Sequence, residues 1–173
     1  MVVDKRGGMD SIKGALAFWR ENELRVGIVS NPDHGSPGID PNTQAKDDKG
    51  RSQPKTVGEI AVIHELGLGH MPDDPPRSFI AATMDNDART IEDSQATVVD
   101  AVLAGKVDAE TALKLLGEDV LEAIKQRIRN RIPPELTDER KAQKVRAGRP
   151  GDTPLVNFGQ LINSVRYSVH KSK

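Results

Sequence analysis

The histidine and glutamate at His64-Glu65, followed by a second histidine at His70, come nearest to a catalytic motif in this chain. A zinc metalloprotease carries its two histidines at positions i and i+4 of one helix, where both rings reach the same metal and the glutamate acts as the base. Here position 68 is leucine, and His70 stands at i+6, about 600° around a helix. The spacing therefore favours a structural or surface role for His64 and Glu65. A metal-dependent hydrolase centred on these residues is a third hypothesis, behind two others given below.

Other patterns that could do chemistry are incomplete. Gly67 and Gly69 are too few for a phosphate-binding loop and are typical of helix ends and turns. The chain has no cysteine, which excludes a thiol nucleophile and thiolate-bound metal centres. The carboxylates of segment 85–93 have the spacing of a solvated helix face. We therefore predict no catalytic residue, no metal site and no cofactor.

A rigid turn is predicted at Pro76-Arg77-Ser78-Phe79. Proline restricts the backbone, and Phe79 can anchor the turn in a core. The forked guanidinium of Arg77 could then bridge the C-terminal carbonyls of a helix or a carboxylate. The alternative is a plain exposed arginine. Pro76, Arg77 and Phe79 are thus candidates for a structural turn.

The basic residues of the chain gather in one segment. Between Lys125 and Arg149 there are nine basic and three acidic residues, a net charge of +6 in a chain whose formal net charge is −1. Lys141, Lys144, Arg146 and Arg149 are the candidates for contact with DNA phosphates or with a partner subunit. No aromatic residue lies among them, so stacking onto single-stranded bases is not expected. A solvated charged loop is the alternative interpretation.

Length and composition favour a single domain over residues 1–173 with an aliphatic core. Aromatic residues make up only 3% of the chain, so the core must rest on leucine, isoleucine, valine and alanine. Such a composition is typical of packed helices with a small sheet. No apolar stretch is long enough to cross a membrane, and the charged N-terminal residues do not resemble a signal peptide.

Hydrophobic periodicity predicts an α+β fold in which a small antiparallel sheet packs against a long antiparallel helical hairpin. The hairpin helices are expected over about 78–104 and 109–131, separated by Gly105, and the sheet should pair strands 24–30 and 164–170. The remaining elements are helices at 10–21, 56–66 and 157–162, a long exposed loop at about 31–54, and a charged loop with a weak helix at about 133–152.

Three separated segments resemble one protein family. They are Gly58-Glu-Ile-Ala-Val-Ile-His-Glu-Leu-Gly-Leu-Gly69, Pro75-Pro-Arg-Ser-Phe-Ile80, and Thr153-Pro-Leu-Val-Asn-Phe-Gly-Gln-Leu-Ile-Asn-Ser-Val-Arg-Tyr-Ser-Val169. In this order they are similar to the virion-morphogenesis proteins of tailed bacteriophages, the small neck, head–tail connector and tail-completion subunits. In that family a helix that contains alanine and then His-Glu-aromatic-Gly is followed by a Pro-x-Arg-x-Phe turn.

The resemblance implies a non-enzymatic structural protein of the virion neck or tail, present in the host cytoplasm during assembly. It implies a homo-oligomeric ring, with a hexamer favoured, that joins the head connector or tail terminator to the tail tube. Non-specific contact with genomic DNA is a further expectation, and no membrane is involved. The alternative hypothesis, from the residues alone, is a nucleic-acid-binding module that uses the basic segment 125–149.

Overall fold

The computed structural model describes residues 6–28, 39–46, 52–68, 76–148, 151, 155 and 160–172. Its helices are α1 (Arg6–Glu21), α2 (Val57–Leu66), α3 (Ala81–Asn86), α4 (Ala88–Leu103), α5 (Ala109–Arg129), α6 (Asp138–Arg146) and α7 (Gln160–Ser164). Its strands are β1 (Asn22–Ile28), β2 (Ile39–Lys46), β3 (Ser52–Thr56) and β4 (Val165–Lys171). The predicted α+β class is confirmed.

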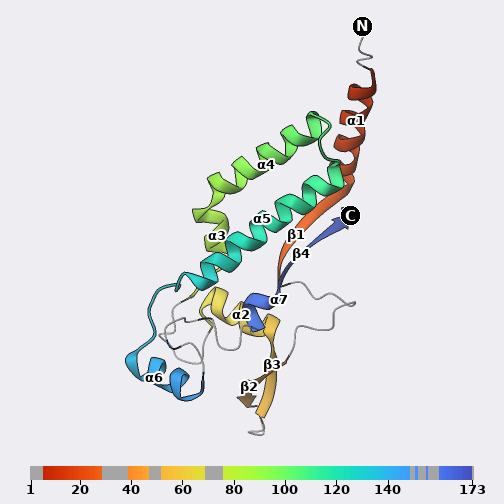
Figure 1. The fold of residues 1–173 in the computed structure, drawn as a ribbon. Coiled ribbons are helices and arrows are strands. Elements are labelled where there is room, and N and C mark those ends of the chain that lie inside the picture. The colour runs from red at the N-terminus through yellow and green to blue at the C-terminus, as the bar shows by residue number, and fades with distance from the viewer. Residues whose placement is uncertain are drawn as a thin grey trace.

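The sheet pairs strands from the two ends of the chain. β1 runs antiparallel to β4, with Asn22 opposite Lys171 and Ile28 opposite Val165. Helix α5 packs on this sheet and on α4, so that it lies between them (Figure 1). The predicted helical hairpin is therefore formed by α4 and α5, and α1 projects at the end of the molecule where they are connected (Figure 1).

The main core lies where α5 meets the sheet, α2 and α7. Its members are buried aliphatic side chains and one aromatic ring: Val57, Ala61, Phe79, Leu116, Val120, Ile124, Ile128, Ile132, Leu155, Leu161 and Val165. The alternating residues Leu24, Val26 and Ile28 of β1 pack against this cluster. A second cluster joins α1 to the α4–α5 connection through Ala15, Val102, Ala109 and Ala112.

Gly117 sets how closely α5 approaches the sheet. A Cβ atom at this position would lie 2.6 Å from Cδ2 of Tyr167 and 3.0 Å from Cδ1 of Leu24. A glycine in the middle of a helix costs about 1 kcal/mol relative to alanine. Here the missing side chain is what allows Tyr167 of β4 to pack directly on the α5 backbone.

The helix ends follow their local sequence signals. Thr56 and Glu59 form a capping box, in which the Thr56 hydroxyl accepts the Glu59 amide and the Glu59 carboxylate accepts the Thr56 amide. Gly67 ends α2 with φ 69°, and the Leu68 amide donates back to the Ile63 carbonyl at 2.9 Å. Asp108 caps α5 by accepting the Thr111 amide.

Two predictions about the elements are wrong. The segment expected to be one helix over 78–104 is two helices, because Asp87 leaves helical geometry with ψ 13°. The sequence Asp85-Asn86-Asp87 at this point consists of poor helix formers. The segment expected to be a loop over 31–54 contains β2 and most of β3, which pair with each other; the rest of it lies outside the described residues. Pairing between two polar strands leaves no hydrophobic alternation to recognise.

Some apolar residues of the amphipathic helices face outward. Leu16 of α1 and Val99 and Leu103 of α4 are exposed. Each is adjacent in the helix to a residue that takes the inward position, Ala15 or Val98 and Val102. When apolar residues are neighbours in a helix, periodicity alone does not decide which of them is buried.

Candidate functional site

The carboxylate of Glu65, near the end of α2, holds the turn that begins α3. One oxygen, Oε1, accepts hydrogen bonds from the Ser78 hydroxyl at 2.7 Å and from the Ala81 amide at 2.8 Å. The other, Oε2, accepts the amides of Phe79 at 2.9 Å and Ile80 at 3.1 Å. The amides at the start of a helix have no partners within the helix, so a carboxylate from another element can satisfy them. We call residues 64–65 and 76–81 the α2–α3 junction.

The junction keeps Glu65 ionised. Partial burial of the carboxyl on its own raises the pKa, but the hydrogen bonds from the Ser78 hydroxyl and from the three amides outweigh that effect. The pKa of Glu65 therefore lies below its usual value. A carboxylate with a lowered pKa and four donors is a poor general base, because its lone pairs are already shared.

Arg77 and Arg127 tie the same turn to the rest of the molecule. The Arg77 amide donates to the His64 carbonyl at 2.8 Å, and its guanidinium donates to the Pro134 carbonyl at 3.3 Å. Nε of Arg127, on α5, donates to the Ser78 carbonyl at 3.1 Å. Phe79 is fully buried in the main core, and Pro76 is exposed. The turn residues proposed from the sequence thus lie at a meeting point of α2, α3 and α5.

The histidine and glutamate do not form a metal centre with the described residues. Both oxygens of Glu65 are taken by the turn, and His70 lies outside the described residues. Among the residues that the structure describes, no group of three or more histidine, aspartate or glutamate side chains is arranged to hold a metal ion. The His64-Glu65 pair instead contributes a carbonyl and a carboxylate to the junction.

The basic candidates are not equivalent in the structure. Lys144 lies on α6 and is only 8% exposed, so it does not fit the expectation of a solvent-facing phosphate contact. Lys141 is half-buried and forms an ion pair with Glu135 at 3.0 Å, which raises the pKa of Lys141 and lowers that of Glu135. Arg146 is exposed, and Arg149 lies outside the described residues. The four cations therefore do not form one exposed patch.

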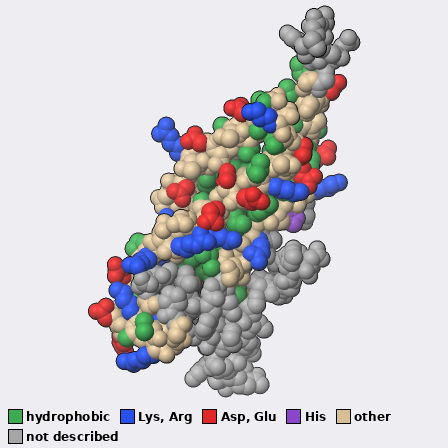
Figure 2. All heavy atoms as spheres, viewed as in Figure 1, with side chains coloured by type: hydrophobic (Ala, Val, Ile, Leu, Met, Phe, Trp, Pro, Cys, Tyr) green, Lys and Arg blue, Asp and Glu red, His purple; other side chains and the backbone are tan. Residues whose placement is uncertain are grey.

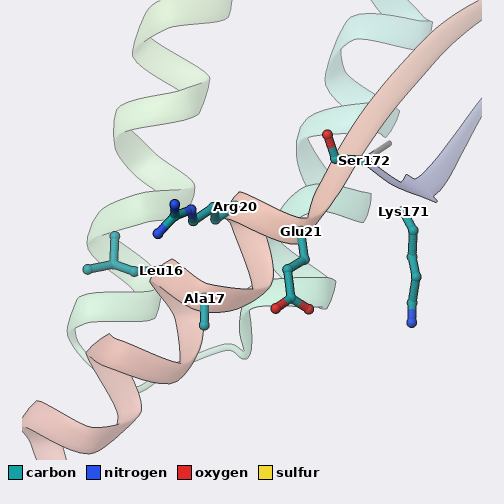
Figure 3. A pocket seen from close by; sticks show the side chains of 6 residues that line it. All are labelled: Leu16, Ala17, Arg20, Glu21, Lys171 and Ser172. Atoms are coloured by element: carbon teal, nitrogen blue, oxygen red, sulfur yellow. The ribbon is translucent and has the colours of Figure 1, made fainter.

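An open hollow of about 730 Å³ lies between the end of α1 and the end of β4. Its lining consists of Leu16, Ala17, Arg20, Glu21, Lys171 and Ser172. The Ser172 amide donates to the Glu21 carbonyl at 2.7 Å and joins the two elements. The lining side chains diverge from one another (Figure 3), so they do not present converging groups to one bound molecule. We assign no chemistry to this hollow.

The sequence analysis missed the roles of two residues, Ser78 within the junction and Arg127, which donates to it from α5. Ser78 donates to Glu65 and accepts the Ala82 amide at 3.0 Å, which is the behaviour of a helix cap. A serine three residues before a helix start could have been recognised if the helix had not been expected to begin at 78. Arg127 carried no signal, because its partner is 49 residues away in the chain.

Among the described helices, none combines the length and the apolar character that crossing a membrane requires. No family model, no curated protein and no solved structure matches the chain.

Proposed function

We propose that this protein is a structural subunit of the neck of a tailed phage, a tail-completion protein that forms a ring and joins the head connector to the tail. The observation that carries the proposal is the α2–α3 junction. Two of the three segments that resemble the virion-morphogenesis family, the His64-Glu65 segment and the Pro76-Arg77-Ser78-Phe79 segment, are hydrogen-bonded to each other. The two segments therefore contact each other in the fold, which gives a structural reason for their order in the chain.

A structural role also agrees with how the polar groups of the junction are used. The carboxylate of Glu65 is committed to holding a helix start, and Arg77 and Arg127 donate to backbone carbonyls of other elements. Polar side chains whose hydrogen bonds fix the relative positions of helices suit a rigid building block. The hairpin of α4 and α5 supplies the long rigid body of that block (Figure 1).

The nucleic-acid-binding alternative receives less support from the basic segment. Lys144 is buried and Lys141 is paired with Glu135, which leaves fewer cations for phosphate contacts than the sequence suggested. Binding that depends on released counterions weakens with each phosphate contact that is lost. We therefore keep DNA contact as a secondary property of the assembled ring.

The proposal is tested by size-exclusion chromatography with light scattering on the purified protein, alone and mixed with phage lysates that contain only heads or only tails. Co-elution with one of these particles, and recovery of joined particles when the protein is added, is the expected result. A protein that co-elutes with neither heads nor tails, and whose affinity for duplex DNA falls steeply with salt concentration, would instead establish the nucleic-acid alternative.

A further inference from the structure

A pocket of about 300 Å³ lies where the start of α4 meets the end of α5. Its polar lining is Asp87, Gln126, Arg127 and Asn130, and its apolar lining includes Ile132 and Pro133. Acidic and basic side chains both occur on the surface of the hairpin (Figure 2), and this pocket contains one of each. Its volume is at the lower end of small-molecule sites, which span about 300–1,000 Å³. We call it the hairpin-end pocket.

The acidic group of the pocket is not used by the fold. Asp87 stands between α3 and α4 as the N-cap residue of α4 and is half-buried. Its carboxylate makes no capping hydrogen bond, and it has no ion pair within the described part of the chain. The helix dipole favours a negative charge at the N-terminus of a helix. The position of Asp87 therefore stabilises a carboxylate whose oxygens remain available to a ligand.

The basic group is held in place by one hydrogen bond and is otherwise available. Arg127 lies in the last turn of α5, where the helix dipole favours a positive charge, and is half-buried. Its Nε donates to the Ser78 carbonyl at 3.1 Å. Among the described residues its two Nη groups have no acceptor, and Asp87 does not pair with it although both line the pocket. The fixed fork of a guanidinium suits a carboxylate, which can accept two parallel hydrogen bonds.

Two side-chain amides complete the polar lining. Nε2 of Gln126 donates to Oδ1 of Asn130 at 3.0 Å. This bond leaves Oε1 of Gln126 as an acceptor and Nδ2 of Asn130 as a donor. Ile132, which is buried, and Pro133 add apolar surface that can contact the carbon atoms of a ligand. The pocket thus offers a charged and a neutral donor together with a charged and a neutral acceptor.

We infer that the hairpin-end pocket binds a small zwitterion, a molecule of amino-acid size that carries one ammonium and one carboxylate group. The carboxylate of the ligand would accept from Arg127 and Asn130, and its ammonium would donate to Asp87 and Gln126. A ligand with negative charge alone is repelled by Asp87, and one with positive charge alone is repelled by Arg127. The inference goes beyond the proposed function and does not depend on it.

The test is an NMR titration of the full chain with glycine, β-alanine and 4-aminobutyrate, in which different numbers of methylene groups separate the two charges. Acetate and methylammonium, which each carry one of the charges, are the matched probes, and the ionic strength is held constant. The signals followed are the backbone amides of residues 87–88 and 126–132 and the side-chain amides of Gln126 and Asn130.

At least one of the zwitterions is expected to shift these signals to saturation, with a dissociation constant in the millimolar range because ligands of so few atoms bind weakly. Acetate and methylammonium should bind at least about tenfold more weakly, since each lacks one of the two charge-assisted contacts. A bound zwitterion joins α4 to α5, so the melting temperature should also rise with its concentration.

Two substitutions locate the binding. Asp87→Asn and Arg127→Lys should each weaken the best zwitterion at least about tenfold, through loss of the charge in one case and of the fork in the other. The controls are Asp85→Asn and Arg129→Lys, which make the same changes at exposed residues that do not line the pocket. Circular dichroism establishes that each variant is folded. If Arg127→Lys does not fold, Asp87→Asn decides, because the Asp87 carboxylate makes no capping bond in the fold.

The inference fails if no zwitterion shifts the pocket signals to saturation, or if acetate or methylammonium binds as tightly as the best zwitterion. It also fails if Asp87→Asn binds that zwitterion as tightly as the wild type does. These outcomes are distinct from those of the proposed function. A chain that binds no zwitterion but co-elutes with phage heads or tails would keep the neck assignment and reject this site.

Discussion

At the scale of single residues, Glu65 shows how a residue type that suggests catalysis is used for structure. Its four hydrogen bonds all go to the turn at residues 78–81. The local sequence predicted that Glu65 would not be a zinc-site base, because the histidine spacing is wrong. It did not predict which groups the carboxylate would bind, since those donors lie 13–16 residues further along the chain.

We expect Glu65→Gln to lower the free energy of unfolding at pH 7 by about 1–2 kcal/mol, because the amide nitrogen cannot accept the hydrogen bonds that an oxygen accepts. The loss should be at the lower end of that range because the carboxylate is partly exposed. Since the pKa of Glu65 is lowered in the folded state, its stabilisation is present above the ordinary glutamate pKa of about 4.3 and disappears as the pH falls through the folded-state value.

Urea unfolding at pH 7 and at about pH 3 measures both effects. The difference in the free energy of unfolding between the wild type and Glu65→Gln should be smaller at the lower pH. The control is Glu122→Gln, which removes an exposed ion pair with Arg129 and should cost less than about 0.5 kcal/mol. An equal difference in the free energy of unfolding at both pH values would show that the charge of Glu65 does not contribute to stability.

At the scale of elements, the structure separates features with local signals from those that depend on distant partners. The caps at Thr56 and Asp108, and the helix end at Gly67, were predictable because the donors and acceptors lie within a few residues of each other. The break between α3 and α4 at Asp87 and the pairing of β2 with β3 were not predictable from local signals. The choice between Val98 and Val99 as the buried residue of α4 was also beyond the sequence, because it is decided by where α1 and α5 pack.

Gly117 was not singled out from the sequence, since its partner Tyr167 lies on the last strand. We expect Gly117→Ala to destabilise the fold by about 1–2 kcal/mol, because overpacking against Tyr167 outweighs the helix propensity gained. The matched control is Gly14→Ala in α1, where a Cβ atom would meet no atom within 4 Å. That variant should be stabilised by up to about 1 kcal/mol.

Thermal unfolding of both glycine variants provides the measurement, and the double variant Gly117→Ala with Tyr167→Ala provides a further check. Once the Tyr167 ring is removed, the added methyl group should be less unfavourable, because the contacts with Cδ2 and Cγ of the ring are gone and the contact with Cδ1 of Leu24 at 3.0 Å remains. Stabilisation by Gly117→Ala in the presence of Tyr167 would contradict the close packing of α5 on β4.

Gly67 combines two constraints at the end of α2. Its φ is 69°, and a Cβ atom would lie 2.8 Å from the Pro76 nitrogen. Gly105 has the same φ of 69° but open space around it. We expect Gly105→Ala to cost about 1–2 kcal/mol for the left-handed backbone alone, and Gly67→Ala to cost more because the Pro76 backbone must also move. If urea unfolding shows that both variants lose the same free energy of unfolding, the Pro76 backbone is able to move away from the added methyl group.

At the scale of the whole molecule, the α+β class and the antiparallel hairpin could be predicted because long periodic segments and a glycine connection determine them. The distribution of charge could be predicted only as an excess of basic residues within one segment. The structure was needed to separate buried Lys144 and paired Lys141 from exposed Arg140 and Arg146. Sequence reports where charges occur along the chain, and folding decides which of them reach the surface.

Deletion of residues 34–53 removes β2 and the first part of β3. The members of both core clusters given above lie outside this segment, so we expect the shortened subunit to remain folded. If the protein is a neck subunit, the deletion should abolish particle assembly, because an adaptable contact with a neighbour is lost. Circular dichroism of the purified variant and complementation of a defective phage measure the two effects. Normal infectious particles would contradict this prediction.

The pairing of β1 with β4 has a consequence for how the protein is made. Residues 22–28 leave the ribosome long before residues 165–171, so the backbone groups of β1 that pair with β4 stay without that partner until almost the entire chain has been synthesised. A chain that terminates early lacks β4, and with it the Tyr167 ring that packs on α5. Incomplete copies also lack Val165, so they are unable to complete the main core.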